Sequence, residues 1–374
     1  MKKIIFKKLT NEILIFFLVF SSALTLIVWV IQAVNYLDIV TEDGHSFQVY
    51  FYYTIFSLPK LFSQLLPFVF FLSVFYIIST YEEKNQLLVY WTHGITKKEL
   101  IDTIIKFSLL FFIIQLLFST IIVPHASNKS RSFIRSSNLD FFPNLIKPKK
   151  FIDTVENLTI FIDSKDQDGT YRNIILKDDT NKDNIQTIIA QTGKIISTND
   201  KKILLLNNGQ IIQTNIKKKI IKFNFEETKF DLSKYSSKTT KTPKIQELKT
   251  SRLLQCVTFL LKNSKKKLNI ENLNCEESFL DNLIRELFKR IYLPCYIVLM
   301  ALTSSLLILK SKNTHNYSLF KTTVFLIGIM FLIISEILLG STGINYLNNL
   351  LFLLAPILFF IFTYQYMRLK IRFN

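Results

Sequence analysis

The sequence predicts an α-helical membrane protein with six transmembrane helices, three before and three after an inserted domain of β-jellyroll type. The first observation is a pair of long apolar blocks, residues 11–123 and 291–367. The second is the segment between them, 124–290, which is rich in Asn, Lys, Asp and Thr and carries short alternating apolar runs. We therefore expect residues 1–123 and 291–374 to lie in a membrane, and the middle domain to lie in water.

The overall composition averages these two kinds of segment. Of the 374 residues, 49% are hydrophobic and 35 are Phe, while the formal net charge is +18. This excludes an ordinary soluble protein and also a bare bundle of apolar helices. Much of the basic charge flanks apolar spans, so it does not indicate a nucleic-acid-binding protein. The first apolar stretch is too long for the apolar region of a signal peptide and predicts a retained anchor.

Six segments are long and apolar enough to cross the hydrocarbon region, which takes about 20 residues of helix. The second of them contains Lys60, which we place at the interface with its ammonium group reaching water. The predicted spans are Ile13–Val34, Leu58–Thr80, Leu100–Val123, Ile291–Leu309, Thr322–Leu339 and Leu347–Tyr366.

The charges of the short loops predict the orientation. Basic residues precede the first span, follow the sixth, and lie between the second and third and between the fourth and fifth. They are Lys2, Lys3, Lys7 and Lys8; Lys84, Lys97 and Lys98; Lys310, Lys312 and Lys321; and Arg368, Lys370 and Arg372. The alternate loops carry acidic residues (Asp38, Glu42, Asp43) or no charge (Gly340–Tyr346). The positive-inside rule then places both termini in the cytoplasm and the middle domain outside, in the periplasm of a cell with two membranes.

The middle domain has the pattern of a β domain. An Asp168-Gly169 turn separates two apolar runs, and Asn207-Asn208-Gly209 predicts a hairpin turn between two more. The predicted strands are Leu158–Ile162, Tyr171–Leu176, Ile185–Ala190, Lys194–Ile196, Ile203–Leu206, Gln210–Gln213 and Lys219–Glu226. Many short strands favour a sandwich or jellyroll; a meander with no role beyond packing is the alternative. Residues 232–250 are predicted to be a connection, and Leu253–Leu261 and Ser278–Arg290 to be helices.

Motifs for enzyme chemistry and for nucleotide binding are absent from the sequence. Gly193-Lys194 lacks the upstream glycine of a P-loop, and there is no GxSxG. The four histidines are scattered and predict no metal site. Cys295 lies in an apolar span, whereas Cys256 and Cys275 share the middle domain. Two free or buried thiols are the simpler expectation for this pair, and a disulfide between them is left open.

The loop between the second and third spans, residues 81–96, has the pattern of a short amphipathic helix that ends near Gly94. Its aromatic residues, Tyr90 and Trp91, lie beside the membrane. One interpretation is a helix that lies on the lipid surface. The other is a coupling helix that docks into a cytoplasmic ATPase, because a transporter without its own nucleotide site needs one.

At this loop the chain resembles the LptF/LptG permeases, which extract lipopolysaccharide from the inner membrane. The family's coupling segment runs roughly Glu-Leu-x-x-Met-x-Ala-x-Gly-x-Ser. Leu87 and Gly94 match it, Thr96 nearly matches, and Gln86 replaces the Glu, which removes a charge from that position. The resemblance extends over nearly the whole chain. Its other marks are Pro59 and Pro67, Pro124, and Glu286-Leu287-x-x-Arg290 before Pro294.

The resemblance implies a mechanical function. In the family, LptF pairs with LptG above an LptB ATPase dimer, LptC adds a helix, and a cavity between the permeases holds lipopolysaccharide. The jellyroll hands the lipid to a periplasmic bridge toward the outer membrane. This chain would bind no cofactor itself, since ATP and Mg would belong to the partner ATPase. Of the two paralogues, LptF is favoured over LptG by the overall sequence pattern of residues 80–96 and 124–150.

Two sets of site residues follow from the resemblance; no catalytic or metal-binding residue is expected. The ATPase-coupling set is Gln86, Leu87, Tyr90, Trp91, Gly94 and Thr96. The set expected to bind lipid phosphate is Lys60, Lys129, Arg131 and Arg135. The simpler interpretation of the second set is that these charges are solvated and anchor helix ends. Glu336, near the outer end of the fifth span, is expected to reach water.

Other functions would leave different marks. A permease of another ABC exporter, such as a lipoprotein-release subunit, generally has four spans. A scaffold or sensor with a periplasmic β binding domain needs no coupling helix. An enzyme acting on membrane lipid needs clustered carboxylates or histidines, which the sequence lacks.

Overall fold

The computed structural model describes residues 2–373, with gaps at 42–44, 137–147, 156, 182–183, 199–200, 216–219, 233–243, 263–267, 271–272 and 276–278. The chain divides into two compact units. Unit 1 comprises Met1–Val30, Ser57–Asn128 and Lys244–Asn374, and unit 2 comprises Ile31–Phe56 and Lys129–Pro243.

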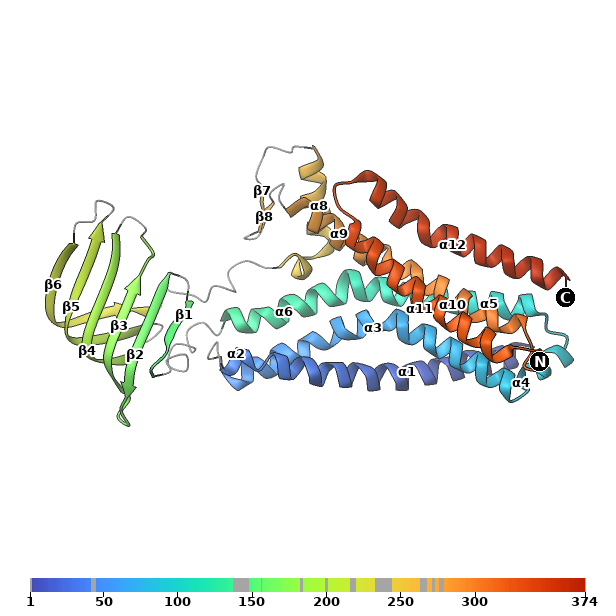
Figure 1. The fold of residues 1–374 in the computed structure, drawn as a ribbon, viewed down its shortest axis with the longest axis horizontal. Coiled ribbons are helices and arrows are strands. Elements are labelled where there is room, and N and C mark those ends of the chain that lie inside the picture. Colours follow the sequence, from blue (N-terminus) through green and yellow to red (C-terminus); the bar gives the residue numbers. More distant parts are fainter. Residues whose placement is uncertain are drawn as a thin grey trace. The chain divides into compact units, whose positions relative to one another are not determined.

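The six predicted spans are confirmed as long helices (Figure 1). All six spans are longer than the apolar windows that predict them, because polar residues at one or both ends continue the helical hydrogen bonding. The elements of the first three spans are α1 (Lys2–Asn35), α2 (Asp38–Thr41), α3 (Phe47–Glu83), α4 (Gln86–Thr92), α5 (Lys97–Leu117), the π-helical turn η1 (Phe118–Ile122) and α6 (Val123–Ser136). Those of the last three are α9 (Leu280–Ile291), η5 (Leu293–Cys295), α10 (Tyr296–Ser305), η6 (Leu306–Leu309), α11 (Tyr317–Ser341) and α12 (Tyr346–Phe373).

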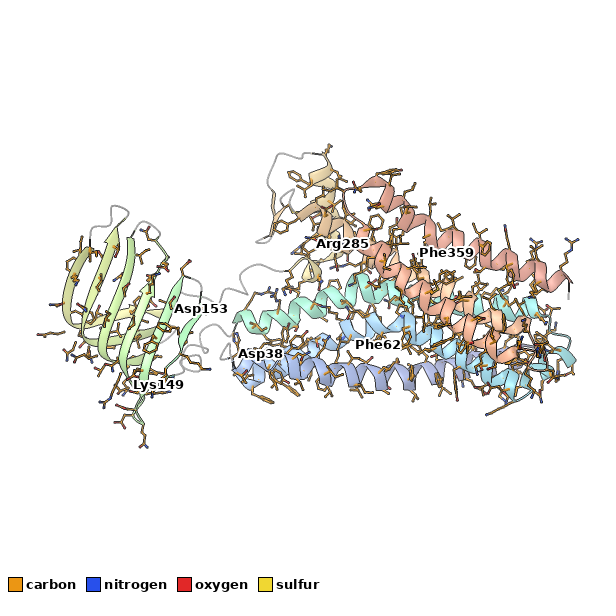
Figure 2. All side chains as sticks on the ribbon, viewed as in Figure 1. Asp38, Phe62, Lys149, Asp153, Arg285 and Phe359 are labelled. Atoms are coloured by element: carbon orange, nitrogen blue, oxygen red, sulfur yellow. A yellow bond between two sulfur atoms is a disulfide. The ribbon has the colours of Figure 1, made fainter. Side chains whose placement is uncertain are left out.

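The second and fourth spans form the centre of the helical unit. Their apolar windows are 67% and 72% buried, against 22–28% for the other four. Every residue of α10 except Val298 is buried, and this helix packs against α5, α11 and α12. Figure 2 shows side chains projecting outward from α1 and α12. The exposed apolar residues of these helices include Leu26 and Phe362. A helix that is apolar all round but buried on one side only is suited to lipid on the other.

Two local departures from α-helix lie in these spans. Pro294 has no N–H to donate, so α9 ends at Ile291 and a 3₁₀ turn leads into α10. The π turn η1 adds a residue to the third span. Such π turns are frequent at functional positions.

Unit 2 contains one six-stranded antiparallel sheet in the sequential order β1-β2-β3-β4-β5-β6. The strands are β1 (Phe151–Val155), β2 (Leu158–Lys165), β3 (Thr170–Asp178), β4 (Asn184–Thr198), β5 (Lys201–Asn215) and β6 (Ile220–Asp231). The predicted insertion of a β domain between the helical blocks is therefore confirmed, and its described strands follow one another as a meander. Lys219 and most of the predicted connection 232–250 lie outside the described residues.

The hairpin predicted at Asn207-Asn208-Gly209 is wrong. These residues lie inside β5, where Gly209 pairs with Ala190 of β4 and with Phe225 of β6. Asn208 has a φ of 51°, the left-handed backbone conformation that an Asn-Asn-Gly sequence favours and that is common in turns. Because both neighbouring strands hold β5 along its length, this residue bends a continuous strand instead of reversing it.

The bend runs across several strands. In β3, Tyr171 and Ile174 are both buried on the inner face although they are three residues apart, and Asn173 between them has a φ of 51°. In β5 the inner residues Leu206 and Ile211 flank Asn208 in the same way. The inner faces of the two halves therefore form one core, in which Leu204 and Leu206 have no exposed surface. A flat, uncovered sheet could not bury its own side chains this fully.

A small helical subdomain in unit 1 includes the start of the fourth span. It consists of α8 (Thr250–Lys262), α9 and the hairpin of β7 (Leu268–Ile270) and β8 (Leu273–Cys275), around a core of its own. The predicted helices Leu253–Leu261 and Ser278–Arg290 correspond to α8 and α9; Ser278 itself is outside the described residues. Cys256 and Cys275 form a disulfide in this core, which corrects the expectation of two free thiols. Spacing along the chain could not show that α8 and β8 meet.

Candidate functional site

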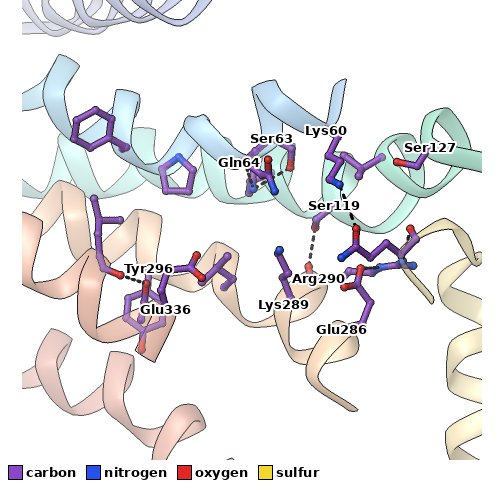
Figure 3. Close-up of a pocket in the computed structure, with 18 residues that line it drawn as sticks. Lys60, Ser63, Gln64, Ser119, Ser127, Glu286, Lys289, Arg290, Tyr296 and Glu336 are labelled. Carbon is purple, nitrogen blue, oxygen red and sulfur yellow. Dashed lines mark hydrogen bonds and ion pairs between the residues drawn. The ribbon is translucent and has the colours of Figure 1, made fainter. Parts of the chain in front are cut away.

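A hollow of about 430 Å³ lies inside unit 1, among residues of α3, α5, η1, α9 and α11 (Figure 3). Its walls are mixed: Phe68, Leu293 and Leu332 supply apolar surface, and polar or charged side chains supply the rest. The polar lining residues are Lys60, Ser63, Gln64, Gln115, Ser119, Ser127, Gln246, Glu286, Lys289, Arg290, Tyr296, Ser335 and Glu336. A hollow of this kind among membrane-spanning helices is a default position for a ligand.

On one side of the hollow α3 and α5 are joined by amide and hydroxyl contacts. Gln115 Nε2 donates to the Ser63 carbonyl (2.9 Å) and to Ser63 Oγ (3.2 Å). The other amide atom, Gln115 Oε1, is buried and has no partner among the described residues. Lys60 Nζ donates to Gln246 Oε1 at 3.2 Å. A buried acceptor without a donor needs a water or a ligand group, and the hollow beside it has room for either.

Arg290 holds the opposite side together. Its side chain is only 3% exposed, and Nε forms an ion pair with Glu286 Oε1 at 2.9 Å, one helical turn earlier in α9. Its remaining nitrogens donate, over 2.8–3.5 Å, to the Thr250 hydroxyl and to the carbonyls of Ile245, Gln246 and Leu248. The guanidinium group thus ties the segment that returns from the β domain to the start of the fourth span.

The π turn of the third span joins the same network. Ser119 Oγ donates to the Arg290 carbonyl at 2.7 Å, and Thr250 Oγ1 donates to the Thr120 carbonyl at 2.6 Å. The third span, the fourth span and the connection from the β domain therefore meet at one point. We call the side chains of Ser119, Glu286, Arg290 and Thr250 the Arg290 network.

The electrostatics of the hollow favour an anion. Glu286 and Arg290 neutralise each other. Lys60, Lys289 and Glu336 form no ion pair within the described part of the chain, and they leave one excess positive charge. Ammonium groups in a partly apolar hollow are well placed to bind phosphate or carboxylate. Among described residues no group of three His, Cys, Asp or Glu side chains could hold a metal ion.

The structure brings only part of the predicted phosphate-binding set to this hollow. Lys60 lines it, whereas Lys129, Arg131 and Arg135 belong to α6 in unit 2, where Lys129 Nζ lies 5.5 Å from the centre of the Phe133 ring. Lys289 was not in the predicted set, because in sequence it is one of several charges at the start of a helix. Glu336, which was expected to reach water, is exposed and contributes to the wall of the hollow.

The loop between the second and third spans contains a short helix, α4, which covers only Gln86–Thr92 of the predicted range 81–96, because Tyr81, Glu82 and Glu83 continue α3. It begins after Asn85, which has a φ of 58°, and it ends before Gly94, which has a φ of 66°. Gly94 therefore supplies the left-handed residue that stops the helix, as predicted. Thr96 caps the next helix: its hydroxyl accepts from the Glu99 N–H, and the Glu99 carboxylate accepts from the Thr96 N–H.

Two residues of the predicted coupling set point into the bundle. Leu87 and Tyr90 are 2% and 3% exposed, and Tyr90 Oη donates to the Ile5 carbonyl at 3.3 Å. Burial raises the pKa of Tyr90 to about 12, so its phenol remains a neutral donor. The helix therefore turns its Leu87–Tyr90 side toward the core, where both residues position α4, and their part in coupling stays a prediction.

The outward face of α4 carries the apolar residues that a partner could contact. Leu88 and Val89 are 55% and 47% exposed. Gln86 and Trp91 lie half-buried at the margin, and Gly94 and Thr96 are exposed. Leu88 and Val89 were not in the predicted set, because in sequence they do not differ from their apolar neighbours Leu87 and Tyr90.

The loops that carry the basic charge come together at this end of unit 1. Lys2 pairs with Glu99 at 3.1 Å, and Lys321 pairs with Glu83 at 2.6 Å. The Lys312 N–H donates to Glu82 Oε1 at 2.7 Å. The N-terminus, the α4 loop and the loop between the fourth and fifth spans therefore lie on one side of the helical unit.

Comparison with known proteins agrees with this architecture. The family model "Lipopolysaccharide export system permease LptF/LptG" matches residues 7–370. The uncharacterized protein RP871 of Rickettsia prowazekii (strain Madrid E) is 25% identical over 237 residues, which cover 63% of this chain and 65% of that protein. The family includes both permeases, so the preference for LptF stays a prediction. With six candidate spanning helices and an inserted β-sheet among its described residues, and a match over nearly its whole length, this chain belongs to the LptF/LptG family of multi-pass inner-membrane permeases.

Proposed function

We propose that this chain is one permease subunit of an ATP-driven ABC exporter that extracts lipopolysaccharide from the inner membrane and passes it to a periplasmic bridge toward the outer membrane. The observation that carries the proposal is the family match over residues 7–370. The hollow supports it, because Lys60 and Lys289 in its lining offer ammonium groups of the kind that bind a phosphorylated lipid headgroup. The chain is a transport subunit, with ATP hydrolysed by a partner.

The proposed orientation has both termini in the cytoplasm and the β domain in the periplasm. Two observations support it. The basic loops meet at one end of the helical unit, as the positive-inside rule requires of cytoplasmic loops. The Cys256–Cys275 disulfide lies in the segment assigned to the other side, and disulfides persist in oxidising compartments such as the periplasm.

The proposed coupling runs through α4. An LptB-like ATPase would contact the exposed side chains Leu88 and Val89, while Leu87 and Tyr90 fix α4 to the bundle. Movement of the ATPase would then displace α1 and α3 together with α4, since Tyr90 contacts Ile5 and the ring of Tyr81. Lys60 lies roughly 35 Å from the end of the same α3 at 1.5 Å per residue, so one helix connects the α4 loop to the hollow.

The proposed partners are an LptG-like permease, an LptB-like ATPase dimer and an LptC-like protein; lipopolysaccharide is the substrate. Co-purification in the natural host tests this assembly. A tagged chain is expected to bring down a second permease of the same family and a soluble ATPase in stoichiometric amounts. If the chain is isolated without an ATPase, a scaffold or sensor becomes the better description.

A second measurement tests the substrate. A photoreactive residue in place of Gln64, which lines the hollow, is expected to form an adduct with lipopolysaccharide during ATP turnover. An adduct with a lipoprotein or another lipid instead would assign the chain to a different exporter.

A further inference from the structure

A second hollow, of about 440 Å³, lies on the outer face of the sheet in unit 2. It follows the bend of the strands, where Asn173 of β3 and Asn208 of β5 adopt positive φ. We call it the amide groove. Ten residues line it, and none is charged: Phe161, Asn173, Ile175, Ile189, Ala190, Gln191, Asn208, Gly209, Gln210 and Asn224.

Strand register places the lining in ordered rows. Phe161 of β2 pairs with Ile175 of β3, and Ile175 pairs with Ile189 of β4, so these three form a continuous apolar strip. The strip continues into a polar end, where Gln210 pairs with both Ile189 and Asn224. Gln191 and Asn208 lie beside it at the bend.

The amides of the groove are free to bind. Gln191, Asn208, Gln210 and Asn224 form no side-chain hydrogen bond within the part of the sheet that the structure describes, and Gln191, Asn208 and Asn224 are exposed. Asn173 is held in place, because its Nδ2 donates to Asp163 Oδ2 at 3.3 Å. Each free amide offers two donors and an acceptor at neighbouring positions.

The groove excludes several kinds of ligand. An ionic group would find no opposite charge in the lining. An acyl chain would desolvate up to five amides without giving them partners. A peptide strand could not add to the sheet here, because β3, β4 and β5 are internal strands whose backbone groups already pair on both sides. Recognition must therefore use side chains.

We propose that the amide groove is a binding site for a neutral saccharide. Sugar hydroxyls are paired donors and acceptors, which match the amides of Gln191, Asn208, Gln210 and Asn224. The C–H face of a sugar ring is apolar and fits the strip formed by Phe161, Ile175 and Ile189. The Phe161 ring is supported by Phe151, whose ring centre lies 4.7 Å away.

Saturation-transfer NMR on the full chain in nanodiscs tests the proposal. The probes are maltoheptaose, chitotetraose and the phosphate-free saccharide released from the host's own surface lipid. Binding of the released saccharide alone identifies a lipid-borne source, and binding of a simple oligosaccharide identifies a free glycan. Either result supports the proposal. If none of the probes binds, the proposal is overturned.

Variants tie the signal to the groove. Asn173→Gly and Asn208→Gly keep the positive φ and remove the amides, and together with Gln191→Leu they are expected to weaken binding at least tenfold. Gln191→Leu alone changes an exposed side chain and is expected to weaken it about fivefold, about 1 kcal/mol. Asn157→Gly is the matched control, since Asn157 has a φ of 59° outside the groove. Equal binding by the triple variant and the control would overturn the assignment.

Discussion

The two ends of the helical unit are built from different kinds of contact. At the α4 end the limits of the helices follow from neighbours in sequence, since Asn85 and Gly94 bound α4 and Thr96 and Glu99 cap α5, although ion pairs such as Lys2–Glu99 then join distant loops. At the hollow, Arg290 binds carbonyl groups more than 40 residues earlier in the chain. The limits of α4 can therefore be recognised from a short stretch of sequence, whereas the hollow forms only when distant segments have folded together.

Arg290→Met is the largest predicted loss and would break the hollow end. The substitution leaves Glu286 without its partner and removes the donors of three carbonyls, which is expected to cost about 3–5 kcal/mol of unfolding free energy. Thermal unfolding of the purified chain in detergent measures it. Lys289→Met is the control and is expected to be nearly neutral, because the adjacent Lys289 forms no ion pair with any described residue. If the Arg290→Met and Lys289→Met variants unfolded at the same temperature, the Arg290 network would not be a main source of stability.

Removal of the disulfide is the next predicted effect. Cys256→Ala with Cys275→Ala opens a link with a sequence separation of 19 residues and is expected to cost about 3 kcal/mol. The loss concentrates in the subdomain of α8 and α9 and would be measured as faster hydrogen exchange there. Cys295→Ala, at the free cysteine, should leave exchange in the subdomain unchanged. Exchange as slow in the double variant as in the native chain would contradict the prediction.

At the α4 end, Leu88→Asp with Val89→Asp is the next predicted change. Both side chains point outward, so the chain is expected to fold normally while ATPase co-purification falls at least tenfold. The control adds two acids to the neighbouring loop, through Asn313→Asp and His315→Asp, and is expected to retain the ATPase. Undiminished ATPase yield from the Leu88/Val89 variant would remove α4 as the docking surface.

Lys60→Met tests the charge of the hollow without disturbing its frame. The ammonium group has one hydrogen bond, to Gln246, so stability should change little. Loss of a charge-assisted contact worth about 1 kcal/mol predicts about fivefold less lipopolysaccharide adduct at position 64. Lys106→Met, an exposed lysine on α5, provides the matched control. A fall of the same size in both variants would show a nonspecific effect of membrane charge.

Gly94→Ala has the smallest predicted effect, and it tests the cost of the positive φ at this residue by itself. A Cβ at this position would meet nothing within 4 Å, so the cost comes from the φ of 66° alone and is expected to be about 1 kcal/mol. Gly340→Ala is the matched control, because it also has open space but lies within α11. It is expected to be neutral or slightly stabilising. An unchanged unfolding temperature for Gly94→Ala would remove the need for glycine there.

Prediction from sequence succeeded where local pattern was sufficient. The apolar windows predicted six spans, and strands Leu158–Ile162 and Tyr171–Leu176 lie within β2 and β3. It failed at Asn208, because a residue with positive φ occurs both in turns and in bends within a strand. Only the pairing of β5 with its neighbouring strands distinguishes the two. It also assigned Leu87 and Tyr90 a contact with a partner, since the family motif marks positions along the loop but does not show which face of the helix the bundle covers.

By itself the sequence determined the membrane class, the order of spans and β domain, the grouping of basic loops and the short helix that ends at Gly94. These depend on composition and on the conformational preferences of neighbouring residues, which act within a few positions of each other. The tertiary structure decided the Arg290 network, the Cys256–Cys275 disulfide, the charged hollow and the amide groove. Each of these needs residues from segments far apart in the chain, and their proximity follows from packing and strand register, which no local pattern contains.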